Sequence, residues 1–350
     1  MKKIRYAVVG LKHGLEHAAA VRRLPGGELA GLCDIDGRQL DKAREAHGLA
    51  RSQCHAAVGD LLGRDDVDAV VVATPPHTHR EVAASVLAAG KHLLLEKPLA
   101  HSVADGLAIV EAAESASAVS QVAFCVRSSQ WVAKCRQVVA SGQIGEVVLM
   151  WYHLFRPYDE HCAGWRTDPD LGGGMLLDCG CHYLDVMCYI AGGRFRRVCA
   201  FAGPARTTGP QAAGPLQVAN VIIEMDTGVK LTLNASEVTD APNHGRFGIV
   251  GTRGKIEADP WLPEGAGSLT VYGDGGLYET QIVIKAAKAS TGHLGFFEQH
   301  QAFYSSITDR TPVVCTPRDA LDNLLLLAAI RESIDSGSVV AGPRPESSMA

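Results

Sequence analysis

The stretch VVGLKHGLEH, residues 8–17, decides the fold of the amino-terminal part of this chain. It joins a short apolar strand, which ends at Gly10, to the start of a helix. In doubly wound α/β domains, a strand that turns at a glycine into a helix places a pyrophosphate against the helix amide groups. We therefore expect a dinucleotide to bind at Gly10, Lys12, His13 and Gly14.

The glycine spacing departs from the usual G-x-G-x-x-G fingerprint, because Lys12 takes the second glycine position and Gly14 comes one residue early. Lys12 could equally be a solvated loop lysine.

Asp34 follows the second strand, where an acid accepts hydrogen bonds from the adenosine ribose and repels a 2′-phosphate. We expect NAD in preference to NADP, although Arg38 softens the preference and an ordinary polar turn is the alternative for Asp34.

Residues 1–124 alternate short β-rich runs with helical stretches. The β-rich runs cover residues 4–10, 27–34, 67–75 and 91–98. Continuous Val, Leu and Ala runs joined by helices are typical of a parallel sheet that is covered on both faces. The pattern predicts an α/β protein whose first domain, residues 1–124, is a doubly wound Rossmann sheet.

Residues 125–350 follow a different pattern. Beyond residue 195, strands follow one another with Gly and Asp-Gly turns and no helices between them, which predicts a large, mainly antiparallel sheet. Helices are expected near residues 130–141, 296–309 and 317–336. We expect this second, α+β domain to bind the substrate and to form the oligomer interface.

Composition excludes several classes of protein. The chain has 350 residues, 47% of them hydrophobic, and a net charge of −5 without a basic run, so nucleic acid is not an expected partner. Its apolar stretches fall short of the roughly 20 residues that cross a bilayer, and its first residues do not form a signal peptide. We expect a cytoplasmic protein without membrane contact. The ten cysteines are dispersed in apolar patterns, which favours reduced thiols over disulfides.

The helical segment DCGCHYLDVMC, which starts at Asp178, contains possible metal ligands and a possible proton relay. At about 100° per residue, Asp178, His182 and Asp185 fall within about 60° of one another on one polar stripe. Cys179 and Cys181 diverge by about 160°, so one ion cannot be held by both from a regular helix. We therefore expect a relay and no metal.

A zinc site that adds His161 and Cys162 from a loop remains the alternative. Cys181 and Cys188 are most simply packing residues. The opposite side of the helix should face the core through Leu176, Leu177, Tyr183, Leu184 and Met187.

Three motifs occur in order along the chain: ATPPHTH at residues 73–79, EKPLA at 96–100 and GGGMLLDCGCHYLD at 172–185. Together they resemble the glucose-fructose oxidoreductase, inositol dehydrogenase and rhizopine catabolism (Gfo/Idh/MocA) family of NAD(P)-dependent oxidoreductases. The resemblance extends over nearly the whole chain. It implies that Lys97 lies at the nicotinamide and the substrate. It also implies further cofactor contacts from Thr74, Pro75, His79, Glu96 and Pro98, with a cis peptide before Pro98.

The same resemblance implies that Asp178 and His182 are the acid and base that face the substrate. Oxidation of a secondary alcohol needs such a pair, because a proton must leave the oxygen while a hydride leaves the carbon. A lysine ammonium would stabilise the developing alkoxide. The resemblance further implies substrate contacts from Arg127, Trp165 and Arg166, with Arg156 and Tyr158 as weaker candidates; a structural surface role is the alternative for each.

We therefore expect an oxidoreductase that transfers a hydride between a nicotinamide cofactor and a sugar, cyclitol or related polyol. Two alternatives stay open. Some relatives cleave glycosidic bonds by transient oxidation, and a non-catalytic regulator that senses nucleotides could use the same fold. The antiparallel half resembles one through which family members pair, so we expect a homodimer or homotetramer.

Overall fold

The computed structural model describes residues 2–157, 168, 174–204, 216–239, 244–260, 266–273, 276–285 and 295–343. Contacts divide the chain into two compact units, which are described separately. The first contains residues 1–128 and 295–324, and the second contains residues 129–294 and 325–350. Residues 295–324, which we expected in the second domain, thus belong to the first unit.

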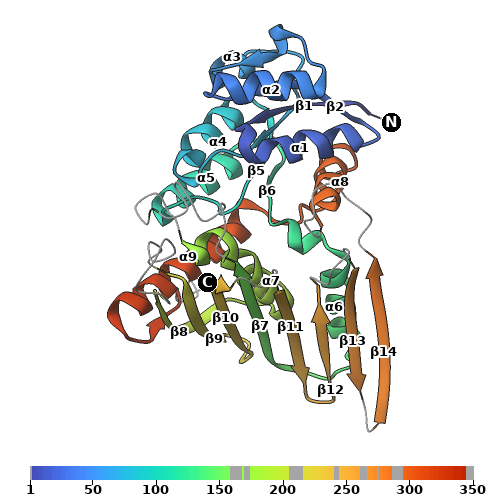
Figure 1. Ribbon diagram of the computed structural model, residues 1–350, viewed down its shortest axis with the longest axis vertical. Coiled ribbons are helices and arrows are strands. Elements are labelled where there is room, and N and C mark those ends of the chain that lie inside the picture. Colours follow the sequence, from blue (N-terminus) through green and yellow to red (C-terminus); the bar gives the residue numbers. More distant parts are fainter. Residues whose placement is uncertain are drawn as a thin grey trace, which may run out of the picture. The chain divides into compact units, whose positions relative to one another are not determined.

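The first unit contains a six-stranded parallel sheet in the order β3-β2-β1-β4-β5-β6 (Figure 1). This order confirms the predicted doubly wound fold, because the chain starts in the middle of the sheet and winds outward in both directions. The strands are β1 (Ile4–Val9), β2 (Gly27–Cys33), β3 (Cys54–His55), β4 (Ala69–Val72), β5 (His92–Leu95) and β6 (Ser120–Val122).

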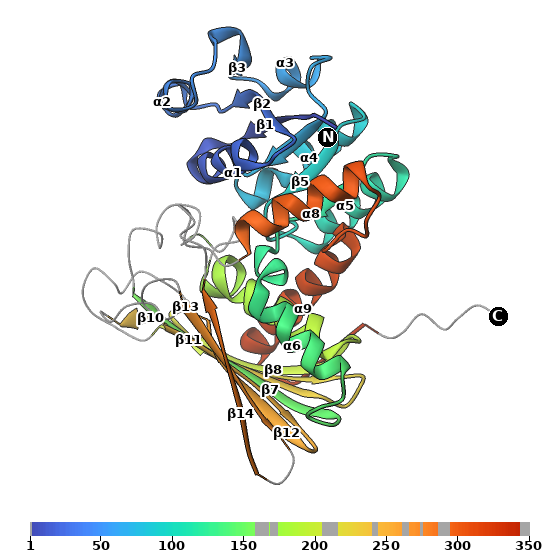
Figure 2. The same ribbon diagram turned by 90° about the vertical axis from the view of Figure 1, so that its right-hand side faces the viewer.

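The crossover helices of this sheet lie on both of its faces. Parallel crossovers are right-handed, so α1 covers one face and α4 and α5 cover the other (Figures 1 and 2). The α-helices are α1 (Leu11–Arg23), α2 (Gly37–His47), α3 (Val58–Leu62), α4 (His79–Ala88), α5 (Val103–Ser115) and α8 (Phe296–Thr308). Short 3-10 helices are η1 (Arg51–Gln53), η2 (Pro76–Thr78) and η3 (Cys125–Ser128).

Helix α8 belongs to this unit because its apolar side chains complete the core. Phe303 is fully buried, and its ring centroid lies 6.3 Å from that of Tyr6 in β1. Ile307 joins the same cluster, together with Val8 and Val21. Burying a phenylalanine side chain stabilises a fold by roughly 1.5–3 kcal/mol, so α8 adds measurably to the core of the first unit.

The second unit contains a nine-stranded sheet in the order β14-β13-β12-β11-β7-β10-β9-β8-β15. Its strand pairs are antiparallel except for β7 and β10, which confirms the prediction of a mainly antiparallel sheet. The strands are β7 (Val147–Pro157), β8 (Phe195–Gly203), β9 (Val218–Met225), β10 (Lys230–Thr239), β11 (His244–Gly251), β12 (Gly254–Asp259), β13 (Ala266–Gly273), β14 (Gly276–Lys285) and β15 (Val340–Ala341).

Helices cover one face of this sheet, as α6 does in Figure 2. Side chains alternate between the faces, so Ile223 of β9 is fully buried while its neighbour Ile222 is 56% exposed. Helices α6 (Gln130–Ala140) and α7 (Cys181–Ala191) belong to this unit, and a π-helix, η6 (Leu176–Gly180), runs directly into α7. Helix α9 (Pro317–Ser336) has its residues up to Leu324 in the first unit and the remainder in the second. Within the described residues, no helix combines the length and the apolar character that crossing a bilayer requires.

Candidate functional site

The turn after β1 passes very close to the end of β4. Gly10 has a φ of 83°, a conformation that side-chain-bearing residues rarely adopt. A Cβ atom at this position would lie 2.8 Å from the carbonyl carbon of Ala73 and from the amide nitrogen of Thr74. Only glycine therefore fits at the point where the chain leaves the sheet, which is where such folds bind a pyrophosphate.

The irregular glycine spacing is accommodated by an early helix start. Helix α1 begins at Leu11, so Lys12 and His13 lie in its first turn. Gly14 faces β1, where a Cβ would lie 2.7 Å from Cγ1 of Val8. Gly14 therefore allows the close packing of helix on strand that the third glycine of the fingerprint usually provides.

Asp34 is held by backbone amides at the amino-terminal end of α1. Its Oδ2 accepts a hydrogen bond from the amide of Leu11 at 2.6 Å, and its Oδ1 accepts one from the amide of Asp36 at 2.8 Å. The bond from Asp36 forms a polar turn of the kind that the alternative for Asp34 requires, and the bond from Leu11 also ties Asp34 to the first residue of α1. Each carboxylate oxygen retains a second lone pair for a ribose hydroxyl, so the predicted cofactor contact remains chemically open.

His79 joins the loops that follow β4 and β5. Its ring is fully buried, with Nε2 2.8 Å from the carbonyl oxygen of Thr74 and Nδ1 3.0 Å from that of Pro98. Burial lowers the pKa of His79, while the nearby carbonyl groups partly oppose this shift. Because its ring is covered, His79 fixes the two loops rather than offering a surface to a ligand. The peptide bond between Lys97 and Pro98 is cis, as the resemblance implies.

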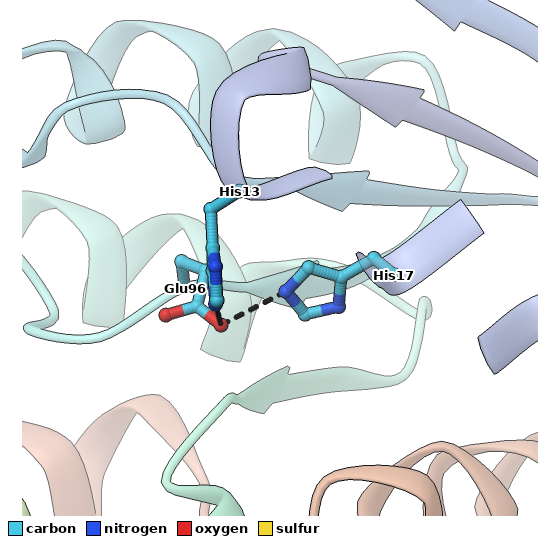
Figure 3. A group of neighbouring side chains, drawn as sticks. All are labelled: His13, His17 and Glu96. Atoms are coloured by element: carbon cyan, nitrogen blue, oxygen red, sulfur yellow. Dashed lines mark hydrogen bonds and ion pairs between the residues drawn. The ribbon is translucent and has the colours of Figure 1, made fainter. Parts of the chain in front are cut away.

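Glu96, directly after β5, is the centre of a group of histidines. Its Oε1 lies 2.9 Å from Nε2 of His17 and 3.7 Å from Nε2 of His13, and both rings point at the carboxylate in Figure 3. Its Oε2 accepts a hydrogen bond from the backbone amide of Lys97 at 3.0 Å. On its other side, His17 Nδ1 lies 2.9 Å from Nε2 of His300 in α8.

The environment keeps Glu96 ionised although only 6% of the residue is exposed. Burial raises the pKa of the carboxyl group, but the hydrogen bond from His17 and nearby positive charge, including that of Lys97, outweigh that effect and hold the pKa well below its usual range. The loop after β5 therefore carries a buried negative charge directly next to Lys97.

The side chains of His13, His17 and Glu96 could also hold a metal ion, because one ligand atom of each lies within 4.8 Å of the others. Two histidines four residues apart on a helix, with a glutamate from elsewhere, are a ligand set that zinc accepts. From the sequence, a metal site was expected, if at all, only near Cys179 and Cys181. The hydrogen bond between His17 and Glu96 already accounts for two of these three side chains, so absence of a metal remains our prediction.

In the second unit, Asp178 and His182 lie where the π-helix η6 meets α7. The amides of Leu177 and Asp178 both donate to the carbonyl oxygen of Gly174, at 3.1 and 3.0 Å. Both Asp178 and His182 are half-buried. The regular wheel on which we placed them was wrong for this segment, because a π-turn has more residues per turn than an α-helix.

Asp185, the third residue of the predicted polar stripe, is only 1% exposed. The predicted core side of the helix is largely confirmed: Leu176, Tyr183, Leu184 and Met187 are buried, and Leu177 is half-buried. Cys181 is fully buried, as packing requires, and Cys188 is half-buried. No disulfide joins the cysteines that the structure describes.

Arg156, only a weak candidate from sequence, lies beside this segment. Burial lowers the pKa of its guanidinium, but Cys179, Glu237 and Asp178 together raise the pKa above its usual value. Its Nε lies 3.5 Å from Oε1 of Glu237, which is opposite Arg156 in the parallel pairing of β7 with β10. Arg156 therefore places a fixed positive charge next to Asp178.

A stack of two tyrosines supports α7 from the sheet. The rings of Tyr152 in β7 and Tyr183 in α7 have centroids 4.0 Å apart and planes inclined by 24°. Burial, together with Tyr152, raises the pKa of Tyr183 well above its usual value, so its hydroxyl group stays protonated near neutral pH. This contact fixes the start of α7, and with it His182, against β7.

Of the remaining predicted substrate contacts, Arg127 lies within the described residues. The guanidinium of Arg127 donates to the carbonyl oxygen of Val314 at 3.2 Å and lies 4.0 Å from Asp319, so it is tied to its own unit. Candidates outside the described residues are Tyr158, His161, Cys162, Trp165 and Arg166. Lys97 belongs to the first unit and Asp178 and His182 to the second, so their joint action remains a prediction.

Sequence reasoning missed His17, His300 and Glu237. His17 could have been found, because it lies one helical turn after His13 and faces the same way. His300 is separated from His17 by 283 residues and carries no local signal. Glu237 required knowledge of which strand pairs with β7.

Comparison with known proteins gives matches in both units. Residues 4–124 match the family described as "Oxidoreductase family, NAD-binding Rossmann fold", and residues 132–257 match the "GFO/IDH/MocA C-terminal domain". Over 171 residues the chain is 32% identical to 1,5-anhydro-D-fructose reductase of Ensifer adhaerens, a match that covers 48% of this chain and 50% of that protein.

A longer match covers 73% of this chain and 73% of scyllo-inositol 2-dehydrogenase (NAD(+)) of Bacillus subtilis, with 27% identity over 257 residues. A crystal structure of an oxidoreductase domain protein from Kribbella flavida has the same fold, with a TM-score of 0.86 and 26% identity. That comparison covers 98% of this chain and 100% of the other.

Proposed function

Because this chain belongs to the GFO/IDH/MocA oxidoreductase family, we propose that it transfers a hydride between a nicotinamide cofactor and a hydroxyl-bearing carbon of a sugar, cyclitol or related polyol. The observation that carries the proposal is the convergence of three loops at adjacent strand ends. Gly10 after β1, Thr74 after β4 and Lys97 after β5 meet at the carboxyl edge of the sheet, where open α/β sheets bind ligands. The reductase and dehydrogenase relatives support the substrate class.

The residues of the first unit fit a dinucleotide. The space that a side chain at Gly10 would fill lies at the amino-terminal end of α1, where the helix dipole favours a pyrophosphate. Lys12 is exposed in the first turn and adds a positive charge. Asp34 would accept hydrogen bonds from the ribose and repel a 2′-phosphate, so we propose NAD rather than NADP.

In the proposed reaction, the bound nicotinamide accepts or donates the hydride. His182 takes the proton from the substrate hydroxyl, because an imidazole titrates near neutral pH. Asp178 orients the imidazole or a substrate hydroxyl, and it interacts electrostatically with the positive charge of Arg156. Lys97 stabilises the negative charge that develops on the oxygen.

The test is a panel of sugars and cyclitols supplied with NAD or NADP, with the absorbance of the reduced nicotinamide as the readout. We expect turnover with at least one polyol and with NAD above NADP. Dinucleotide binding without turnover on any member, and without activity on glycosides, would instead favour a regulator. Release of a free sugar from a glycoside would favour the glycosidase.

We propose that the protein is a homodimer or homotetramer that pairs through the open face of the nine-stranded sheet. Three apolar side chains that alternate with the buried residues of its strands are exposed: Phe155, Phe201 and Ile222. A monomer rarely leaves such a group uncovered on one sheet face. Light scattering would test this, and Ile222→Lys should weaken the assembly because it puts a charge in the interface.

A further inference from the structure

We propose that His300 is a positioning residue: through His17 it fixes the Glu96 carboxylate, and with it the backbone from which Lys97 extends. The four groups form a continuous chain of contacts. His300 Nε2 lies 2.9 Å from His17 Nδ1, and His17 Nε2 lies 2.9 Å from Glu96 Oε1. Glu96 Oε2 accepts a hydrogen bond from the Lys97 amide at 3.0 Å.

Burial makes this chain rigid. His17 and His300 are both fully buried, and the side chain of His17 packs between Phe296 and His300, with ring centroids 4.7 and 5.0 Å away. Water therefore does not compete for these hydrogen bonds, and a broken one leaves a buried polar atom without a partner. The Glu96 carboxylate has little freedom to rotate.

The hydrogen-bonding pattern assigns the protons. Burial lowers the pKa of His300 well below its usual value, so His300 is neutral and carries one ring proton. Its Nδ1 has no hydrogen-bond partner among the described residues. A proton on Nδ1 would be an unsatisfied buried donor, so the proton belongs on Nε2, facing His17. His17 then accepts at Nδ1 and donates from Nε2 to Glu96.

In this arrangement each ring carries one proton, and its N–H group donates along the chain in the direction of Glu96. Two neutral imidazoles point their N–H groups toward a single carboxylate, and Glu96 uses its second oxygen to hold the Lys97 amide. On the far side, His79 holds the carbonyl of Pro98. The residues on both sides of Lys97 thus contact buried histidines.

A metal at His13, His17 and Glu96 is the competing use of the same atoms. In that case Nε2 of His17 would be unprotonated and would face the ion rather than donate to Glu96. Lys97 lowers the pKa of Glu96 by its positive charge, and the same charge would oppose a bound cation. The hydrogen-bonded chain is therefore the better account of this cluster.

Nitrogen-15 NMR of the histidine rings in the ligand-free protein tests the chain of protons without a substrate. We expect neutral rings at His17 and His300, each with its proton on Nε2. A doubly protonated His17, or zinc bound stoichiometrically and lost in His17→Gln, would overturn the proposal.

The positioning role rests on the proposed function and is tested by turnover. His300→Leu should lower kcat on the order of tenfold to a hundredfold, with little change in dinucleotide affinity, since a small misplacement of a catalytic group has effects of that size. His300→Gln should restore most of the loss, because its side-chain amide can donate to His17 Nδ1. Gln299→Met, which removes a buried polar side chain from the same helix, should leave kcat unchanged.

Equal losses in His300→Leu and Gln299→Met, or the absence of rescue by His300→Gln, would contradict the positioning role. If the unmodified protein turned over no substrate, the proposed function would fail, while the ring protonation states would still decide whether the hydrogen-bonded chain exists.

Discussion

Replacing Gly10 by alanine should damage both the stability of the first unit and its affinity for a dinucleotide. The new Cβ would lie 2.8 Å from the backbone of Ala73 and Thr74, at a residue whose φ is 83°. The left-handed conformation costs about 1–2 kcal/mol for a residue with a side chain, and an extra carbon in a packed site costs about 1–3 kcal/mol more. We expect a total loss of roughly 2–5 kcal/mol.

Gly48→Ala is the matched control, because Gly48 has a φ of 64° and no atom within 4 Å of an added Cβ. Gly48→Ala should lose only the stability that the left-handed backbone conformation costs, about 1–2 kcal/mol. Urea unfolding followed by circular dichroism gives the two losses, and fluorescence titration gives NADH affinity, which should fall at least about tenfold in Gly10→Ala alone. Equal stability losses and equal affinities would show that the turn after β1 does not press against the end of β4.

Other expected outcomes concern the cofactor, the base, acid stability and metals. Asp34→Ala should narrow the gap between NAD and NADP affinities in a binding titration and, because Asp34 also caps α1, should destabilise the protein by about 1 kcal/mol. His182→Ala should remove the acidic limb of the pH profile of kcat for alcohol oxidation, where activity falls as the base becomes protonated, and an unchanged limb would assign the base elsewhere. The pKa of the Glu96 carboxyl group is lowered in the folded protein, so ionised Glu96 stabilises the fold above the ordinary pKa of a glutamate, and this stabilisation is lost as the pH falls below that value. The melting temperatures of Glu96→Gln and of the unmodified protein should therefore converge in acid. Turnover should survive chelator treatment, and loss of activity together with release of zinc would contradict the metal-free account.

The parallel sheet could be predicted from sequence because its information is local. Buried strands such as Ala69–Val72 are continuous apolar runs, and each is followed by an amphipathic helix. The role of Gly14 is also local, since it depends on one turn of helix packing against the preceding strand.

The place of α8 could not be predicted in the same way. Phe303 packs against Tyr6, almost three hundred residues earlier, and an amphipathic helix gives no sign of which sheet it will cover. The pairing of His17 with His300 depends on the same long-range packing. For this reason the sequence identified Glu96 and Lys97 but not the histidines that hold them.

The start of α7 shows a second limit. A wheel at a fixed angle per residue assumes one helix type, and the π-turn at Leu176–Gly180 breaks that assumption where Asp178 lies. The wheel also gave no indication that Asp185, on the same polar stripe, is buried. Exposure of a single polar residue depends on what packs over it, which periodicity does not encode.

The measurement that tests the central claim most directly is the steady-state turnover of Lys97→Met beside the unmodified protein, on the best polyol found with NAD. The substitution keeps the length of the side chain and removes its charge. The account predicts that dinucleotide binding persists while kcat falls by on the order of a hundredfold or more. Near-normal turnover by Lys97→Met on that substrate would contradict the assignment of Lys97 as the cation that stabilises the reacting oxygen.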